Sequence, residues 1–160
     1  MSKQYYHADT YSTRNSVSYL VKRAHGLSLD SIEPGLGEQG LTFTQYAVLM
    51  ALRDDLALNA KDICIKLRHD SGALTRVLDQ LEARGLVQRH RSAEDRRAVE
   101  LHLTAQGQAA LKTAVPLVVD RINSAVQNFS HAEMDELLRL LNKLILGFQT
   151  QAESQSGASA

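Results

Sequence analysis

The spacing of apolar residues predicts a mainly helical chain with one short β-hairpin. Residues 14–30 have apolar positions three and four apart, which is typical of an amphipathic helix. This helix is expected to end at the loop Glu33-Pro34-Gly35-Leu36-Gly37, because glycine and proline favour turns. Thr42-Phe43-Thr44-Gln45 is a capping-box pattern, and the helix that it opens is expected to stop near Asp54.

Two further helices are predicted next, each with a polar residue that can cap it. Asn59 can cap a short helix that contains Ile63, and Asp70 can cap the helix that follows. The second helix is expected to end at Arg84-Gly85, where glycine suits the left-handed conformation. Its apolar residues lie at i, i+3, i+4 and i+7, so they define one buried face: Leu74, Val77, Leu78 and Leu81.

After Gly85 the apolar period changes to two, which indicates strands. Residues 86–91 and 99–103 are the predicted strands, and residues 92–98 between them are polar and charged. The sequence therefore predicts a β-hairpin with a charged tip.

The remaining residues predict two longer helices. The first runs from about Thr104 to Asn128, and Pro116 is expected to kink or interrupt it. Ser130-His131-Ala132-Glu133 is a second capping box. The helix that it opens carries a broad apolar stripe from Met134 to Phe148, which this small chain cannot cover alone, so a partner chain is expected.

This order of elements predicts a winged helix-turn-helix in a mainly α (α+β) fold. Residues 41–104 would form the DNA-binding domain. Residues 14–32 and 105–149 would form a helical dimerisation region, and residues 1–12 and 151–160 would be flexible termini.

Composition narrows the class of protein. The formal net charge is zero, but residues 61–97 hold nine Lys/Arg against six Asp/Glu, which suits a surface that faces phosphate. No apolar run is long enough to span a membrane, and the N-terminus lacks the apolar segment of a secretion signal. The single cysteine, Cys64, cannot form an internal disulfide. These features predict a cytoplasmic protein.

The predicted helix after Asp70 would be the recognition helix, whose N-terminal residues enter the major groove. Its exposed positions can approach the duplex closely or bond to phosphates and bases: Ser71, Gly72, Ala73, Thr75 and Arg76. At the hairpin tip, Arg96 and Arg97 suit a narrow, electronegative minor groove, and the Asp95 carboxylate can hold one guanidinium in place. An ordinary solvated turn is the alternative for this tip.

Several of these pieces together resemble the MarR family of bacterial regulators. Thr75-Arg76, Leu81-Glu82, Gly85-Leu86-Val87 and Asp95-x-Arg97 follow the order and spacing of that family, and the resemblance extends over residues 14–148. The resemblance implies a triangular homodimer in which Arg97 enters the minor groove and Asp95 orients it. Two lobes on a two-fold axis predict a pseudo-palindromic double-stranded operator with half-sites about 10 bp apart.

The resemblance also implies a repressor that a small aromatic or phenolic acid releases from DNA. An arginine could bind the carboxylate, and a tyrosine or histidine could bond to a ring hydroxyl. The candidate ligand residues are Tyr19, Arg23, His25, Tyr46, Arg68 and His69. Each has an alternative, since Tyr19 and Tyr46 occupy core-like positions and Arg68 could contact a DNA phosphate instead.

Other functions have weaker support. Cys64 could sense oxidants, although its apolar neighbours favour a small core residue of blunted reactivity. A ligand-independent regulator, or a winged-helix interaction module without DNA binding, are further alternatives. No spacing typical of a metal site, a phosphate-binding loop or a catalytic triad is present, so neither an enzyme nor a cofactor is expected.

Overall fold

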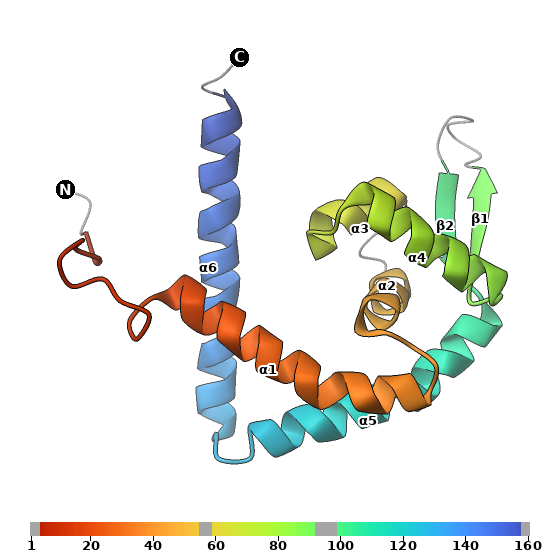
Figure 1. Cartoon of the computed structure of the whole chain (residues 1–160), viewed down its shortest axis with the longest axis horizontal. Coiled ribbons are helices and arrows are strands. Elements are labelled where there is room, and N and C mark those ends of the chain that lie inside the picture. The colour runs from red at the N-terminus through yellow and green to blue at the C-terminus, as the bar shows by residue number, and fades with distance from the viewer. Residues whose placement is uncertain (1–3, 55–58, 92–98, 158–160) are drawn as a thin grey trace. The chain divides into compact units, whose positions relative to one another are not determined.

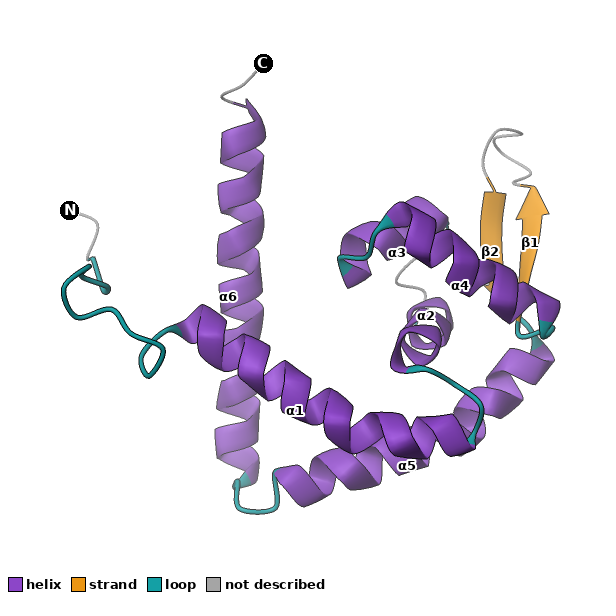
Figure 2. Cartoon of the chain, in the orientation of Figure 1, coloured by secondary structure: helices purple, strands orange, loops and turns teal. Residues whose placement is uncertain are grey.

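The computed structural model describes residues 4–54, 59–91 and 99–157. Within these ranges the chain is mainly helical with one antiparallel hairpin, which confirms the predicted fold class (Figures 1 and 2). Residues 1–122 form one compact unit and residues 123–160 a second, and each is described by itself. The elements are α1 (Val17–Glu38), α2 (Phe43–Arg53), α3 (Ala60–Leu67), α4 (Ser71–Ala83), β1 (Val87–Arg91), β2 (Val99–Leu103), α5 (Ala105–Ala125) and α6 (His131–Gly157).

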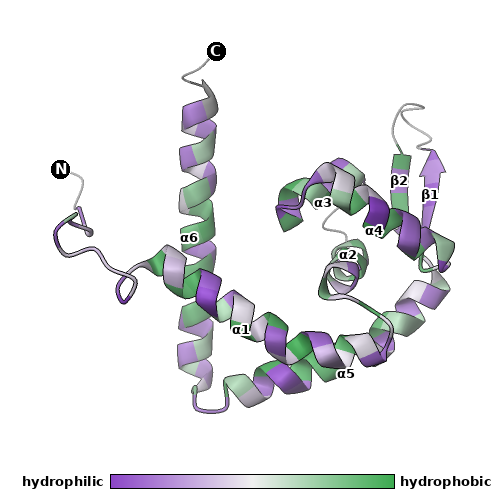
Figure 3. Cartoon of the chain, viewed as in Figure 1, coloured by the Kyte–Doolittle hydropathy of each residue, from purple (hydrophilic) through white to green (hydrophobic). Residues whose placement is uncertain are grey.

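The core of the first unit is built around α2. Val48 and Leu49 are fully buried, and α1, α3, α4, α5 and the hairpin contribute apolar residues around them. Figure 3 shows α2 as a largely hydrophobic helix among more mixed ones. The contributing residues from the other elements include Ile32, Leu36, Ile63, Leu74, Leu78, Leu81, Val87, Leu101, Leu111 and Ala114.

Helix α1 does not end where the sequence predicted. It continues through Pro34 to Glu38, so the expected loop at residues 33–37 is wrong. A proline inside a helix costs roughly 3 kcal/mol. Ile32 and Leu36 offset that cost because they are 2% and 0% exposed, and each fully buried side chain of this kind contributes about 1.5–3 kcal/mol.

Helix α5 contacts the rest of the first unit at two places, α1 and the base of the hairpin. Pro116 lies inside it without interrupting it. Near its middle, α5 packs closely against α1, since a Cβ added to Gly35 would lie 2.5 Å from Cδ2 of Leu117. At its start, the Thr104 hydroxyl donates to the Gly85 carbonyl at 2.7 Å and accepts from the Gly107 amide at 3.0 Å, which fixes α5 to the base of the hairpin.

Helix α6 begins with the predicted capping box. The Ser130 amide donates to Glu133 Oε2 at 2.8 Å, and the Glu133 amide donates to Ser130 Oγ at 3.3 Å. The hydrogen bond from the Ser130 backbone lowers the pKa of Glu133. The helix extends to Gly157, so residues 151–157 continue α6, whereas the sequence predicted that a flexible terminus begins at residue 151. Apolar and polar residues alternate along its length (Figure 3).

The segment before α1 makes contacts that apolar spacing does not reveal. The Val17 amide donates to the Tyr6 hydroxyl at 3.0 Å, and the hydroxyls of Tyr11 and Ser16 are 2.6 Å apart. Ser16 is the N-cap of α1 and accepts from the Tyr19 amide. Three polar contacts therefore surround the first turn of α1.

The close packing at Gly107 gives a stability prediction. An added Cβ would overlap the Leu86 carbonyl oxygen and lie 2.7 Å from Leu103 Cδ1, so Gly107→Ala should lower the free energy of unfolding by about 1–3 kcal/mol. At Gly37 a Cβ meets nothing within 4 Å, so Gly37→Ala should raise it by about 0.5–1 kcal/mol. Urea denaturation measures both variants. If Gly107→Ala raised the free energy of unfolding as much as Gly37→Ala does, the contact between α5 and the hairpin would be loose.

Candidate DNA-binding surface

Helices α3 and α4 are joined by a turn of three residues. Helix α3 ends at Leu67, and Arg68 adopts a left-handed conformation with φ of 52°. The His69 amide donates to the Cys64 carbonyl at 3.1 Å, and Asp70 Oδ1 accepts from the Ala73 amide at 2.9 Å. One bond closes the end of α3 and another caps the start of α4 within this turn, so the start of α4 is held in place relative to α3.

Helix α4 has one buried face and one open face. Leu74, Leu78 and Leu81 are 0–1% exposed and hold the helix on the core. Of the residues predicted to meet DNA, Ala73 is half-buried and the others are exposed: Ser71, Gly72, Thr75 and Arg76. The structure therefore brings these five predicted residues together at the N-terminal end of one helix.

The chemistry of this open face suits an anionic partner. Thr75 Oγ1 donates to the Ser71 carbonyl at 2.8 Å, which leaves its oxygen lone pairs available. Arg76 is exposed and forms no ion pair with another residue that the structure describes. The partial positive charge at the start of α4 adds to this, as do exposed cations on α3 and in the turn: Lys61, Lys66 and Arg68.

Polar side chains fasten the other end of α4 to the rest of the unit. Gln45 is 6% exposed, and its amide nitrogen donates to Gln80 Oε1 at 3.0 Å. Arg84 Nη1 donates to the Gly40 carbonyl at 2.7 Å. The Gln45 oxygen also closes the predicted capping box, since it accepts from the Thr42 amide at 3.1 Å. These bonds link α4 to the start of α2 and to the turn before it.

The predicted hairpin is confirmed in the described residues. Val87 pairs with Leu103, Arg89 with Leu101, and Arg91 with Val99. Val87 and Leu101 are 1% and 2% exposed, which places this face of the hairpin base on the core. The predicted tip residues Asp95, Arg96 and Arg97 lie outside the described residues.

The predicted ligand residues are spread over three regions. Tyr19 and Arg23 are exposed on the first half of α1, and Arg68 and His69 are exposed in the α3–α4 turn. Tyr46 is 8% exposed within the core.

Contacts through the start of α2 connect some of these regions. The Phe43 ring lies 6.1 Å from His25 and 6.3 Å from Tyr46, measured between ring centroids, and Thr44 Oγ1 is 3.4 Å from His69 Nε2. The start of α2 thus lies between α1 and the α3–α4 turn.

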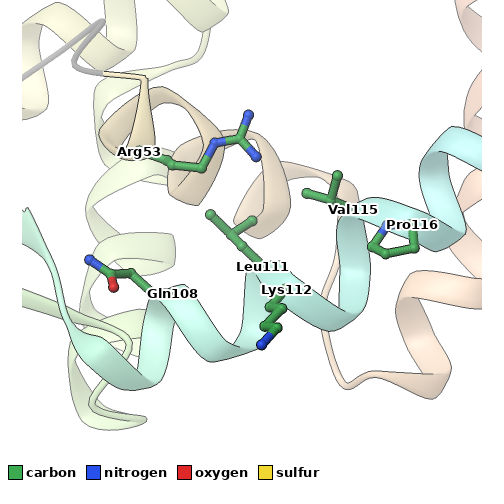
Figure 4. A pocket seen from close by; sticks show the side chains of 6 residues that line it. All are labelled: Arg53, Gln108, Leu111, Lys112, Val115 and Pro116. Carbon is green, nitrogen blue, oxygen red and sulfur yellow. The ribbon is translucent and has the colours of Figure 1, made fainter.

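A cleft lies between the end of α2 and the first half of α5 (Figure 4). Its volume is about 320 Å³, and Leu111, Val115 and Pro116 make it partly apolar. Arg53 projects from α2 toward α5, and Lys112 projects from α5 in the direction away from Arg53 (Figure 4). Gln108 completes the lining.

Tyr46 does not line this cleft, but it is close enough to Arg53 for the two groups to interact electrostatically. Burial raises the pKa of the Tyr46 hydroxyl, and the positive charge of Arg53 partly opposes that rise. Arg53 is itself paired with Asp54, with Nε and Oδ1 2.7 Å apart, and this hydrogen bond raises the pKa of the guanidinium. Neither Arg53 nor Lys112 was among the residues that the sequence suggested.

Three further observations bear on other classes of protein. Cys64 is a free thiol that is half-buried against the core. Among the described residues, no three His, Cys, Asp or Glu side chains are grouped so that they could hold a metal ion. No helix in the described part of the chain is both long and apolar enough to cross a membrane.

The fold and the open face of α4 define a winged helix-turn-helix protein, and comparison with known proteins agrees. Residues 41–99 match the MarR family. The chain is 34% identical to the HTH-type transcriptional regulator MgrA of Staphylococcus aureus over 113 residues, which cover 71% of this chain and 76% of MgrA.

Two solved structures are also similar. A mutant of E. coli MarR complexed with operator DNA has a TM-score of 0.70 and 28% identity, over 80% of this chain and 92% of that one. BpsR of Bordetella bronchiseptica, whose DNA binding is described as regulated by 6-hydroxynicotinic acid, has a TM-score of 0.72 and 28% identity. It is matched over 84% of this chain and 96% of its own.

The chain belongs to the MarR family and is a DNA-binding transcriptional regulator. A second relative that matches, SarZ of Staphylococcus aureus, is also an HTH-type transcriptional regulator, 34% identical over 69% of this chain and 73% of SarZ. The resemblance that the motifs indicated is therefore confirmed.

Sequence patterns did not identify every residue that shapes this surface. Arg89 lies on β1 and pairs with two carboxylates of α4, Asp79 and Glu82. The signal was present, since a charged residue interrupts the buried alternation of the strand, but its partners become apparent only when the hairpin is placed beside α4.

The N-cap of α4 gives a second prediction. Asp70→Ala removes the acceptor for the Ala73 amide and should lower the free energy of unfolding by about 1 kcal/mol. Asp70→Asn keeps a good cap and should leave stability nearly unchanged while removing a negative charge beside the residues predicted to meet DNA. Chemical denaturation compares the two variants. Equal destabilisation by both would mean that the carboxylate charge matters more than the cap.

Proposed function

We propose that this regulator is a dimeric repressor that binds a pseudo-palindromic operator and is released by a small aromatic or phenolic acid. The observation that carries the DNA-binding mode is the open N-terminal end of α4, held by Leu74, Leu78 and Leu81. A helix fixed in this way can enter the major groove without reorganising. Such a regulator would act in the cytoplasm, where bacterial DNA is found.

Each exposed residue of α4 has a proposed role. Arg76 would bind guanine or phosphate, and Ser71 and Thr75 would bond to phosphates or base edges. Gly72 and Ala73 offer little hydrogen bonding of their own and would let the backbone approach the duplex. In the wing, Arg97 would enter the minor groove with Asp95 orienting it and Arg96 beside it.

Exposed apolar side chains support dimerisation. Large apolar residues usually avoid water, and a second copy of the chain would cover those on α1, α5 and α6. They are Leu20, Val21, Leu27, Val119, Ile122, Leu137, Leu138, Leu140, Ile145, Leu146 and Phe148.

The cleft between α2 and α5 supports an effector of the proposed kind. Its apolar lining suits an aromatic ring, and Arg53 and Lys112 are positive charges that suit a carboxylate. Tyr46 lies near Arg53, so it remains a candidate ligand residue. Tyr19, Arg23, Arg68 and His69 remain candidates on the basis of the family resemblance alone, because none of them lines this cleft.

Selection from a random DNA pool, followed by affinity measurements at several salt concentrations, tests DNA binding. We expect an inverted repeat with half-sites about 10 bp apart. Arg76→Ala and Arg97→Ala should each weaken binding by about tenfold or more. Arg139→Ala is the matched control, because it removes a cation that is paired with Glu136 within α6, and it should leave the affinity unchanged. Binding without sequence preference or salt dependence would favour an interaction module.

The same complex tests release. Hydroxylated aromatic acids should raise the operator Kd, and Lys112→Met should weaken that response while leaving DNA binding intact. If no acid acts but peroxide releases the DNA, and Cys64→Ser abolishes that release, the redox alternative is correct. If neither treatment acts, the regulator is independent of such ligands.

A further inference from the structure

The ion-paired group formed by Arg89, Asp79 and Glu82 lies where the hairpin meets α4. Arg89 Nη2 donates to Asp79 Oδ1 and Nη1 donates to Glu82 Oε2, each at 2.7 Å. The two carboxylates are three residues apart, so they lie on one side of α4. One guanidinium on β1 therefore bonds to two points on α4 through two nitrogens of a rigid planar fork, whereas the compact, rotatable ammonium of lysine would not fix the direction of both bonds.

Arg89 occupies the last anchored position on the inner face of the hairpin. The pairs on this face are Val87–Leu103, Arg89–Leu101 and Arg91–Val99. Burial ends along that series, since Leu101 is 2% exposed whereas Val99 is 46% exposed and Arg91 is also exposed. The next described pair, Arg91–Val99, therefore lies outside the core.

Arg89 and Leu101 are therefore the last described residues on this face that join the hairpin to the rest of the unit. A two-stranded hairpin is only marginally stable by itself, so its orientation relative to α4 depends on contacts with the rest of the unit. Leu101 supplies a non-directional apolar contact. Arg89 supplies two directional bonds, and both end on α4.

Without Arg89, the negative charges of Asp79 and Glu82 would be unfavourable at their positions on α4. Glu82 is in the last turn of α4, where the helix dipole disfavours negative charge. Asp79 and Glu82 also place negative charge on a helix that must approach phosphates. Their pairing with Arg89 neutralises that charge and supplies a reason for both to be there.

The contribution of this group to stability is small. The side chains of Arg89, Asp79 and Glu82 are 31%, 57% and 40% exposed, and pairs as exposed as these typically contribute about 0–1 kcal/mol. Its consequence is therefore mainly geometric.

We propose that Arg89 is a positioning residue for DNA recognition: it fixes the base of the wing to the recognition helix, so that both reach their grooves of the same half-site together. This inference rests on the proposed contact of Arg97 with DNA. It assigns to Arg89 no contact with DNA of its own.

A double-mutant cycle with Arg97 tests the inference. Arg97→Ala should weaken operator binding about tenfold in the unaltered chain but only about threefold or less in an Arg89→Met background, because a wing that is no longer fixed contributes less. Arg89→Lys keeps the charge without the fork and should give an intermediate ratio. In an Arg139→Met background, which removes an ion pair confined to α6, the full tenfold effect should remain.

A second variant removes the same bonds from the opposite side. Asp79→Asn combined with Glu82→Gln leaves the hairpin unaltered and makes the lobe more positive. If Arg89 served only to neutralise charge, this variant would bind DNA more tightly and retain the full Arg97→Ala effect. We expect instead the same reduced effect that Arg89→Met gives, with the free energy of unfolding nearly unchanged. If Arg89→Met does not fold, the Asp79→Asn, Glu82→Gln variant still tests the positioning role of Arg89.

The outcomes separate this inference from the proposed function. A full Arg97→Ala effect in both backgrounds that lack the ion-paired group would overturn the role of Arg89 and leave the wing contact intact. An Arg97→Ala variant that binds like the unaltered chain would overturn the wing contact, and the inference with it. A reduced effect in both backgrounds supports the inference.

Discussion

The burial of the leucine face of α4 is the interaction on which the rest of this structure depends. Leu74, Leu78 and Leu81 are 0–1% exposed, and they pack into a core that α2 fills from the centre. Full burial of a leucine side chain contributes roughly 1.5–3 kcal/mol, which exceeds what any of the exposed ion pairs on this helix can supply. The apolar face determines which side of α4 remains open, and the open side carries the residues that suit DNA.

Apolar packing alone leaves a helix free to slide or tilt by small amounts, and the polar contacts restrict those movements. The turn at Asp70 fixes the first turn of α4, the Gln45–Gln80 and Arg84–Gly40 bonds fix its far end, and Arg89 joins it to the hairpin. These bonds reach α2, the turn before it and β1. Under the proposed function, an effector in the α2–α5 cleft would act on DNA binding through these neighbours of α4.

Local features of the fold could be predicted from the sequence because their causes are local. Thr42, Asn59 and Asp70 cap helices as expected, Gly85 has the positive φ that its position after α4 requires, and the change to a period of two marks the hairpin. The helical end at Pro34 was predicted wrongly because the compensating burial of Leu36 involves residues distant in sequence.

The candidate site shows the same division between local and distant causes. The open face of α4, which we propose meets DNA, could be predicted from helical spacing, since an apolar face also defines the face opposite to it. Arg89, Arg53 and Lys112 could not be predicted in this way, because each gains its importance from an element far along the chain. The proposed ligand residues came from the family resemblance, and only Tyr46 lies near the cleft.

Hydrogen exchange of the chain with and without its selected operator duplex tests whether the open end of α4 faces DNA. We predict that DNA slows exchange in peptides covering residues 68–76 and the hairpin, and that peptides covering α2 are unchanged because they are already buried. Slowed exchange confined to other surfaces, with residues 68–76 unaffected, would contradict this claim.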